Sequence, residues 1–236
     1  MNPLHERIRR LPAGVEFLVV LSFAFGLPIF TSIVSLGTGG RDGTGGVLVY
    51  NNAALLNILV FELLQSAFLV WFLRIRGWTL ARFGLSITWR GAGAGWLLLV
   101  GTYLLAMGTQ YLAQLALPGT MQAAVQRYPV PGPNLSMELV FLASTVNGFF
   151  EELFVAGYII TALRQTRGMW TAINVSTVVR VLYHLYQGPV GVLIIVPMGL
   201  LYGYVYERTR QLWPLMFAHV LIDLIGLSQI IHWLQP

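Results

Sequence analysis

The sequence predicts an all-α fold: a polytopic integral membrane helix bundle of about seven transmembrane helices, with a cytoplasmic N-terminus. Of its 236 residues, 56% are hydrophobic and only 10% are charged, whereas soluble domains carry about 25% charged residues. Apolar runs of the roughly 20 residues that cross a bilayer recur along the whole chain. The composition therefore excludes a soluble globular enzyme, a coiled coil and a disordered chain.

Seven apolar segments are predicted to span the membrane within a single transmembrane domain, residues 1–236. They are residues 15–36, 52–73, 92–117, 137–163, 169–186, 189–206 and 212–234. The first is expected to be a retained signal anchor, because its apolar run is too long for a cleaved signal peptide. Segment 76–90 mixes aromatic residues with arginine, which predicts a helix lying in the cytoplasmic interface. The glycine-rich segment 36–46 predicts a flexible linker, and the segment 117–136, with four prolines, predicts an outer loop.

The distribution of the 14 basic residues, all of them arginine, predicts the orientation. The seven spans put eleven arginines on one side of the membrane and Arg41 and Arg127 on the other, and Arg180 lies inside a span. Under the positive-inside rule, the N-terminus is then cytoplasmic and the C-terminus lies outside. The arginines form no basic patch, so no nucleic-acid partner is expected. The absence of cysteine excludes disulfides and thiolate chemistry.

Ionisable residues inside the predicted spans are the informative ones, because each costs about 2.5–3.5 kcal/mol at the centre of a membrane helix. They are Glu16, Glu62, Glu138, Glu151, Glu152, Arg180, His184, His219, Asp223 and His232. Glu16, Glu138 and His232 lie near helix ends and are expected at the interface. Glu62 is alone in its helix, and we expect it to be a protonated or helix-paired carboxyl.

The other six ionisable residues lie on three helices. Glu151 and Glu152 are adjacent, while Arg180 and His184, like His219 and Asp223, are four residues apart and share a helix face. Facing lipid alone, the six would cost on the order of 15 kcal/mol, so we expect them to face one another in the bundle. Asn, Ser or Thr would hold helices together at lower cost, which favours a functional site over a structural network.

These side chains predict a water-activating hydrolytic site. A carboxylate can deprotonate a water, and a histidine can orient that water or donate to a developing oxyanion. Asp223, on the same face as His219, is expected to fix the tautomer of that ring. The same side chains could also ligate zinc. The motifs of other intramembrane hydrolases, HExxH, GxSxG and GxGD, do not occur.

The three clusters resemble the CPBP family of intramembrane proteases, which includes the CAAX prenyl endopeptidases and the bacteriocin-processing or immunity (Abi) proteins. The family pattern is EExxxR on one helix, FxxxH on the next and HxxxN or HxxxD on a later one. Here the order and helix placement match in Glu151-Glu152, in Arg180 to His184 and in His219 to Asp223. The resemblance covers about residues 76–225.

The resemblance implies that Glu151 activates the water and that His184, His219 and Asp223 complete the catalytic site. If a divalent metal such as zinc is used, the same four residues would be its ligands; no other cofactor is expected. Two positions depart from the pattern, because Ala156 replaces the arginine of EExxxR and Arg180 replaces the phenylalanine of FxxxH. We interpret this as a relocated positive charge, and expect Arg180 to contact Glu152 or Glu151 as a supporting residue.

The predicted function is an intramembrane endopeptidase that cleaves a membrane-associated or lipidated protein or peptide, with the lipid bilayer as its environment. The predicted location is the cell (inner) membrane, in a multi-pass arrangement. Two alternatives remain open at this point. One is a non-catalytic membrane partner or bacteriocin-immunity protein that retains the fold, and the other is a proton-coupled transporter that uses the same carboxylates.

Overall fold

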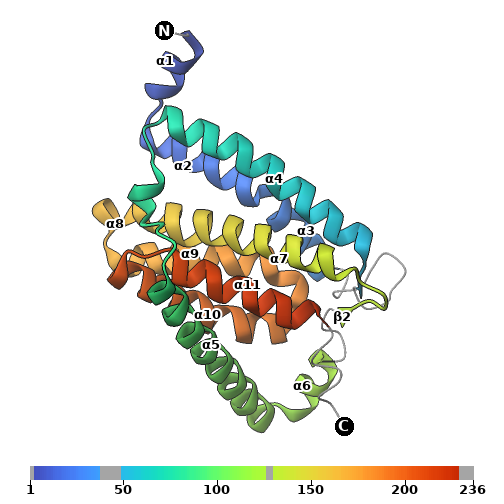
Figure 1. Cartoon of the computed structure of the whole chain (residues 1–236). Coiled ribbons are helices and arrows are strands. Elements are labelled where there is room, and N and C mark those ends of the chain that lie inside the picture. Colours follow the sequence, from blue (N-terminus) through green and yellow to red (C-terminus); the bar gives the residue numbers. More distant parts are fainter. Residues whose placement is uncertain (1–2, 38–48, 126–129, 229–236) are drawn as a thin grey trace.

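The computed structural model describes residues 3–37, 49–125 and 130–228, and it confirms the all-α class (Figure 1). Its elements, with η1 and η3 π-helical and η2 and η4 3-10-helical, are α1 Pro3–Arg9, α2 Ala13–Leu21, η1 Ser22–Gly26, α3 Leu27–Gly37, β1 Val49–Tyr50, α4 Asn52–Ile75, η2 Leu80–Phe83, α5 Trp89–Ala116, α6 Pro118–Val125, β2 Val130–Pro131, α7 Met137–Glu151, η3 Glu152–Ile160, α8 Thr161–Arg167, α9 Met169–His184, η4 Leu185–Gln187, α10 Gly188–Thr209 and α11 Trp213–Leu227. Most of the predicted linker 36–46, together with Arg41, Arg127 and His232, lies outside the described residues.

Five helices in the described part of the chain are long and apolar enough to cross a membrane, and they support a multi-pass membrane protein. They are Ala13–Gly37, Asn52–Ile75, Trp89–Ala116, Met137–Arg167 and Met169–Thr209. The last contains the 3-10 turn η4, where α9 gives way to α10. The two helices run antiparallel, because Gly199 lies against Thr177 and Gly203 against Ile173. Helix α11 is apolar but shorter. The count of seven spans and the orientation of the N-terminus stay predictions.

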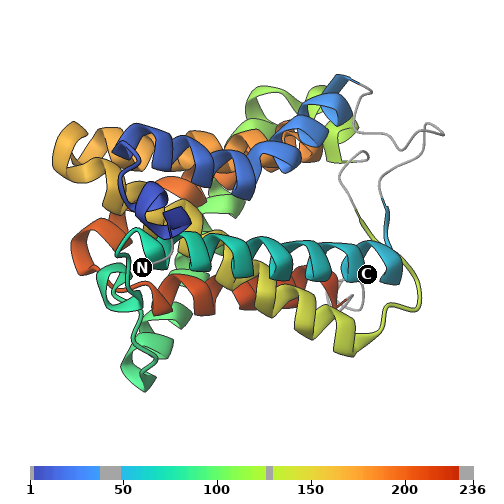
Figure 2. The same ribbon diagram turned by 90° about the horizontal axis from the view of Figure 1, so that it is seen from above.

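The helices form a closed ring in cross-section (Figures 1 and 2). Helix α3 packs on α9, α9 on α10, and α10 on α5. On the other side, α5 packs on α11, α11 on α7, and α7 on α4. The segment η1, which directly precedes α3, packs on α4 and so closes the ring. The π-helical segment η3 lies inside this ring, against α9, α10 and α11. The segment η3, in the second half of the predicted span 137–163, is therefore the central element of the bundle. Residues at the start of η3 face the interior of the ring.

Polar backbone groups inside the ring find side-chain partners. Pro197 has no N–H to offer the carbonyl of Leu193 four residues earlier, and Thr109 Oγ1 on α5 donates to that oxygen at 3.0 Å. In η3, where the helix widens, Ser176 Oγ donates to the carbonyl of Val155 at 2.8 Å. Such partners are needed because no water in a bilayer core would satisfy these carbonyls.

The arginine-rich segments gather at one end of the bundle. Arg76, at the end of α4, donates to the carbonyls of Ile8 and Arg9, the last two residues of α1. Arg164 and Arg210, at the ends of α8 and α10, both pair with Glu207, at 2.9 and 3.3 Å. These helix ends therefore lie together, as the arginine distribution predicts.

The interfacial helix predicted over residues 76–90 is wrong. The segment contains only the short turn η2, because Gly77 and Gly84 adopt left-handed backbone conformations that interrupt a helix. Gly84 also passes so close to the carbonyl of Arg210 that a Cβ would lie 1.7 Å from that oxygen. Trp78 and Phe83 are buried rather than facing lipid, so this segment closes the end of the bundle.

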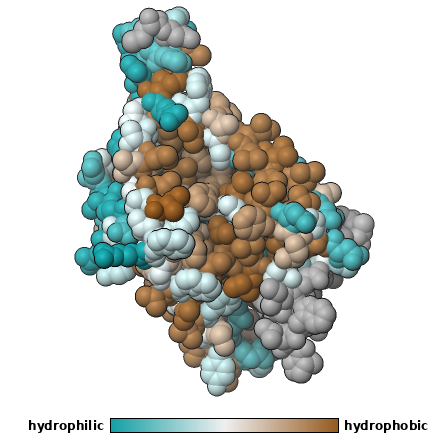
Figure 3. All heavy atoms as spheres, viewed as in Figure 1, coloured by the Kyte–Doolittle hydropathy of each residue, from teal (hydrophilic) through white to brown (hydrophobic). Residues whose placement is uncertain are grey.

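The surface matches a membrane protein. Figure 3 shows hydrophobic side chains over much of the face that carries α4 and α7, while hydrophilic ones gather over α1 and at the left edge near α8. Large apolar side chains such as Leu64 (67% exposed) and Leu97 (76%) point outward from the long helices. In water such a surface would be unstable, whereas in lipid it is the expected exterior.

Candidate active site

The six polar residues predicted to face one another surround one cavity of about 240 Å³ inside the ring. Its walls come from α4, α7, α9, α10 and α11, and β1 and β2 lie at its end. Five of the six, all except Glu152, line it directly. The lining residues are Tyr50, Leu55, Ile58, Pro131, Ala143, Ser144, Asn147, Glu151, Arg180, His184, Tyr186, Gln187, Ile194, Ile195, Met198, His219, Ile222, Asp223, Gly226 and Leu227.

The adjacent acids sit where the fourth span changes from α-helix to π-helix. Glu151 is the last residue of α7 and Glu152 the first of η3, and such π segments often occur at functional sites. One turn earlier, Gly148 lets α7 approach α11, since a Cβ there would lie 2.8 Å from Val220 Cγ2. This close approach brings the two glutamates within reach of His219.

Glu152 is fully buried and holds two partners from other helices. Arg180 Nη2 donates to Glu152 Oε2 at 2.8 Å, and His219 Nδ1 lies 2.6 Å from Glu152 Oε1. The predicted contact of Arg180 with the glutamate pair is thus confirmed, with Glu152 as the closer partner. Arg180 Nη1 is 3.6 Å from Glu151 Oε2.

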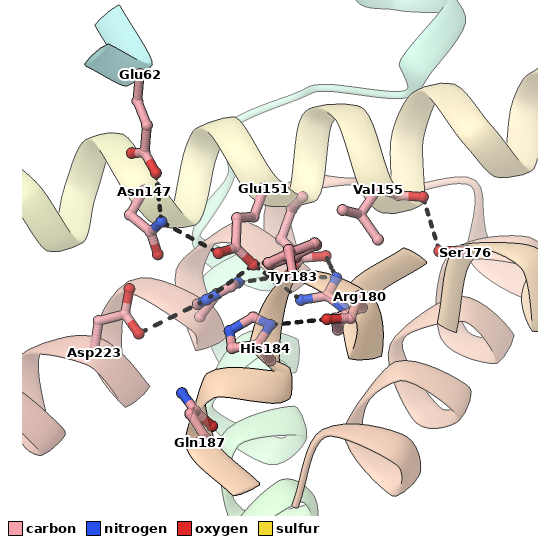
Figure 4. A network of polar contacts seen from close by, with 12 residues as sticks. Glu62, Asn147, Glu151, Val155, Ser176, Arg180, Tyr183, His184, Gln187 and Asp223 are labelled. Atoms are coloured by element: carbon pink, nitrogen blue, oxygen red, sulfur yellow. Dashed lines mark hydrogen bonds and ion pairs between the residues drawn. The ribbon is translucent and has the colours of Figure 1, made fainter. Parts of the chain in front are cut away.

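Each carboxylate oxygen of Glu151 accepts one hydrogen bond. Tyr183 donates to Oε2 at 2.5 Å, and Asn147 Nδ2 donates to Oε1 at 3.2 Å (Figure 4). Glu151 is only 6% exposed, yet it lines the cavity. The carboxylate is therefore held in one orientation beside a space that can hold a substrate.

Each of the two histidines has one ring nitrogen bonded to the protein and one that remains open. The bonded nitrogen contacts the backbone in His184 and Glu152 in His219. His184 Nδ1 bonds to the carbonyl of Arg180 at 2.9 Å; because a carbonyl only accepts, this nitrogen carries the hydrogen and Nε2 remains available. His219 Nε2 lies 3.7 Å from Asp223 Oδ1 and 3.9 Å from Glu151 Oε2. Both rings can exchange a proton or a hydrogen bond with a molecule in the cavity.

The expected role of Asp223 in fixing the tautomer of His219 is wrong in this geometry. Glu152 occupies Nδ1 of that ring, and Asp223 lies near the other nitrogen at a distance too long for a hydrogen bond. The spacing of four residues placed Asp223 on the same helix face as His219. It could not reveal that Glu152, from η3, bonds to Nδ1 of the His219 ring.

Sequence reasoning missed two members of the site and set aside a third. Asn147 and Tyr183 bond to Glu151, and Asn147 Nδ2 also donates to Glu62 Oε1 at 2.7 Å. Glu62 is therefore paired, as expected, but its partner belongs to the site. The position of Asn147, four residues before Glu151 on one helix face, was the available signal.

The cluster does not fit a metal ion. Within the described residues, no group of three or more histidine or acidic side chains is arranged to hold one. His219 Nδ1 and one oxygen of Glu152 are already bonded to each other, and Arg180 places a positive charge beside both glutamates. No step below is therefore assigned to a metal.

The chain was compared with known families and proteins. Residues 133–225 match the model of a family described as Rce1-like, type II CAAX prenyl endopeptidase. This segment is therefore similar to the type II CAAX prenyl endopeptidases. The match contains all three clusters but none of the helices from α1 to α6. No curated protein and no solved structure matches the chain. The description of the family names an endopeptidase, and the described part of this chain has five helices that are long and apolar enough to cross a membrane.

Proposed function

We propose that this protein is an active intramembrane endopeptidase of the cell membrane, which hydrolyses a peptide bond in a membrane-associated or lipidated protein or peptide. One observation carries the proposal. Glu151, His184, His219 and Asp223, from three helices, line a single cavity inside the helix ring. The chain is proposed to form one transmembrane domain around that cavity, over residues 1–236.

Glu151 is the proposed general base. Arg180 pairs more closely with Glu152 than with Glu151, at 2.8 against 3.6 Å. Each oxygen of Glu151 accepts one hydrogen bond from the protein, so a second lone pair remains available for a water in the cavity. As the water oxygen bonds to the scissile carbonyl carbon, one of its protons passes to Glu151. His184 Nε2, on the open side of its ring, accepts a hydrogen bond from the second O–H of the water and so orients it; that hydrogen stays on the oxygen that becomes part of the product acid.

His219 is the proposed oxyanion donor. A protonated His219 ring carries a hydrogen at Nε2, on the cavity side, and can donate it to the tetrahedral oxygen. Glu152 holds the ring through Nδ1. When the C–N bond breaks, the departing nitrogen takes the proton from Glu151, and the carboxylate is restored. The net change is the addition of one water to one peptide bond. Asp223 is proposed to stabilise the positive charge of the protonated His219 ring, since its carboxylate lies 3.7 Å from His219 Nε2.

The replacement Glu151→Gln tests this function. Processing of quenched peptides in lipid vesicles, with and without a prenylated CAAX end, should fall by about 10²- to 10⁴-fold, the usual contribution of a general base. Glu138→Gln, in the exposed first turn of the same helix, should leave processing unchanged. Unaltered melting would show that Glu151→Gln is folded. Cleavage that persists in Glu151→Gln would contradict the proposal and favour a non-catalytic role.

A further inference from the structure

We propose that Glu62 is a positioning residue for Glu151, acting through the side-chain amide of Asn147. The inference rests on the proposed function, since it assigns a partner to the proposed base. Glu62 lies on α4, outside the segment that matches the CAAX family. The N-terminal half of the chain would thus contribute to a site whose three motifs lie in the C-terminal half.

The geometry forms a relay of two hydrogen bonds. Asn147 Nδ2 carries two hydrogens, and it donates one to Glu62 Oε1 at 2.7 Å and the other to Glu151 Oε1 at 3.2 Å (Figure 4). The amide group is planar, so fixing one hydrogen fixes the direction of the other. The shorter bond is the one to Glu62, which makes Glu62 the anchor of the amide.

A carboxylate at position 62 also determines which end of the amide faces Glu151. The amide of Asn147 has a donor end and an acceptor end, and a rotation of its plane exchanges them. Glu62 Oε1 accepts from Asn147 Nδ2, and this bond selects the orientation in which Nδ2 points at both glutamates. In the opposite orientation, Asn147 Oδ1 would face Glu151 Oε1, and two acceptors would repel each other.

The environment of Glu62 argues against a role confined to holding α4 on α7. Its side chain is only 8% exposed within a membrane span, which is a costly position for an acid. Its second oxygen, Oε2, has no hydrogen-bond partner among the described residues. A neutral polar side chain would join the two helices at lower cost. The carboxyl oxygen Oε1 of Glu62 gives the amide of Asn147 an acceptor, and this bond fixes the orientation of the amide.

The test is a double-mutant cycle on the full-length protein in lipid vesicles, with the quenched peptides as probe. Glu62→Met and Asn147→Leu should each lower kcat by about tenfold, the lower range for removing a partner that orients an active-site group, with KM within about twofold. The double variant should be no slower than Asn147→Leu alone, because both changes break one relay. Glu62→Gln should retain most of kcat, since its amide oxygen can accept the same bond.

The control is Leu63→Met, at the neighbouring, half-exposed position of α4, which should keep wild-type kcat. The inference is overturned if Glu62→Met keeps full kcat, or if the losses of the two single variants multiply in the double variant. In either case Glu151→Gln still decides the proposed function separately. If the wild-type protein cleaves none of the peptides, thermal melting of the wild type, Glu62→Met, Asn147→Leu and the double variant decides instead. Losses of stability that are coupled in the double variant support the relay, and additive losses overturn it.

Discussion

Two buried acidic clusters in this protein differ in how completely their charges are matched. Glu16, on α2, accepts hydrogen bonds from Arg76 at 2.5 Å, Trp78 at 2.9 Å and Tyr158 at 3.1 Å. One carboxylate thus meets one guanidinium and two neutral donors. Glu16, whose position at the membrane interface stays a prediction, is buried, because these three partners from the end of α4, the following segment and η3 enclose it.

The second cluster, which we call the cavity cluster, consists of Glu151, Glu152, Arg180, His184, His219 and Asp223. In this cluster the acidic groups outnumber the guanidinium groups. Arg180 pairs with both Glu151 and Glu152, and Asp223 lies 3.7 Å from His219, so three acids are grouped with one guanidinium. Ring nitrogens of two histidines also face open space rather than a fixed partner. The comparison suggests that matched charges hold elements together, whereas unmatched charges around a cavity are available to a substrate. Three changes test this difference, in order of decreasing effect.

Arg180→Phe should have the largest effect on folding. Removing the guanidinium leaves Glu152, which is fully buried, without the arginine that pairs with it at 2.8 Å. The expected loss is about 3–5 kcal/mol of unfolding free energy, measured by thermal or denaturant unfolding in detergent. Adding Ala156→Arg restores the family pattern and should recover part of the loss. Recovery should be incomplete, since Ala156 is itself only 1% exposed. Equal behaviour of the single and double variants would refute the relocated charge.

Glu16→Gln should destabilise the fold but spare the chemistry. The amide keeps one acceptor for Trp78 and Tyr158 and loses the charge that faces Arg76, so a loss of about 1–3 kcal/mol is expected. The kcat of the folded fraction should match the wild type, because Arg76, Trp78 and Tyr158, which bond to Glu16, do not line the cavity. A drop in kcat of tenfold or more would show that the two clusters are not separate.

Tyr183→Phe should have the smallest effect on stability and a measurable one on rate. It removes one hydrogen bond to Glu151 but keeps the ring, which stacks on Phe25 with centroids 5.0 Å apart. We expect kcat to fall by up to about tenfold, equivalent to about 1.4 kcal/mol, with melting nearly unchanged. Phe25→Leu serves as the comparison, since it disturbs the stacking without removing the hydroxyl. A rate equal to wild type in Tyr183→Phe would exclude an orienting role for the hydroxyl.

Much of the fold follows from local features of the sequence. Within the described residues, each predicted apolar segment is helical, because hydrophobic runs and the need to satisfy backbone groups in lipid act within one segment. The failure over residues 76–90 has an equally local cause, since Gly77 and Gly84 adopt backbone conformations that a composition argument ignores. The π-helical geometry of η3 was not predicted, because it depends on partners such as Ser176 from a neighbouring helix.

The sequence alone determined which residues carry the candidate chemistry. Acids and histidines are costly in a membrane, so their presence and their spacing of four residues already indicate faces that must meet. Only the tertiary structure decided which atom meets which. Glu152 rather than Asp223 bonds to Nδ1 of His219, and Glu62 reaches Glu151 through Asn147. These pairings depend on how each helix is rotated and how closely it packs, and residues 67 and 85 positions apart carry no local signal of either.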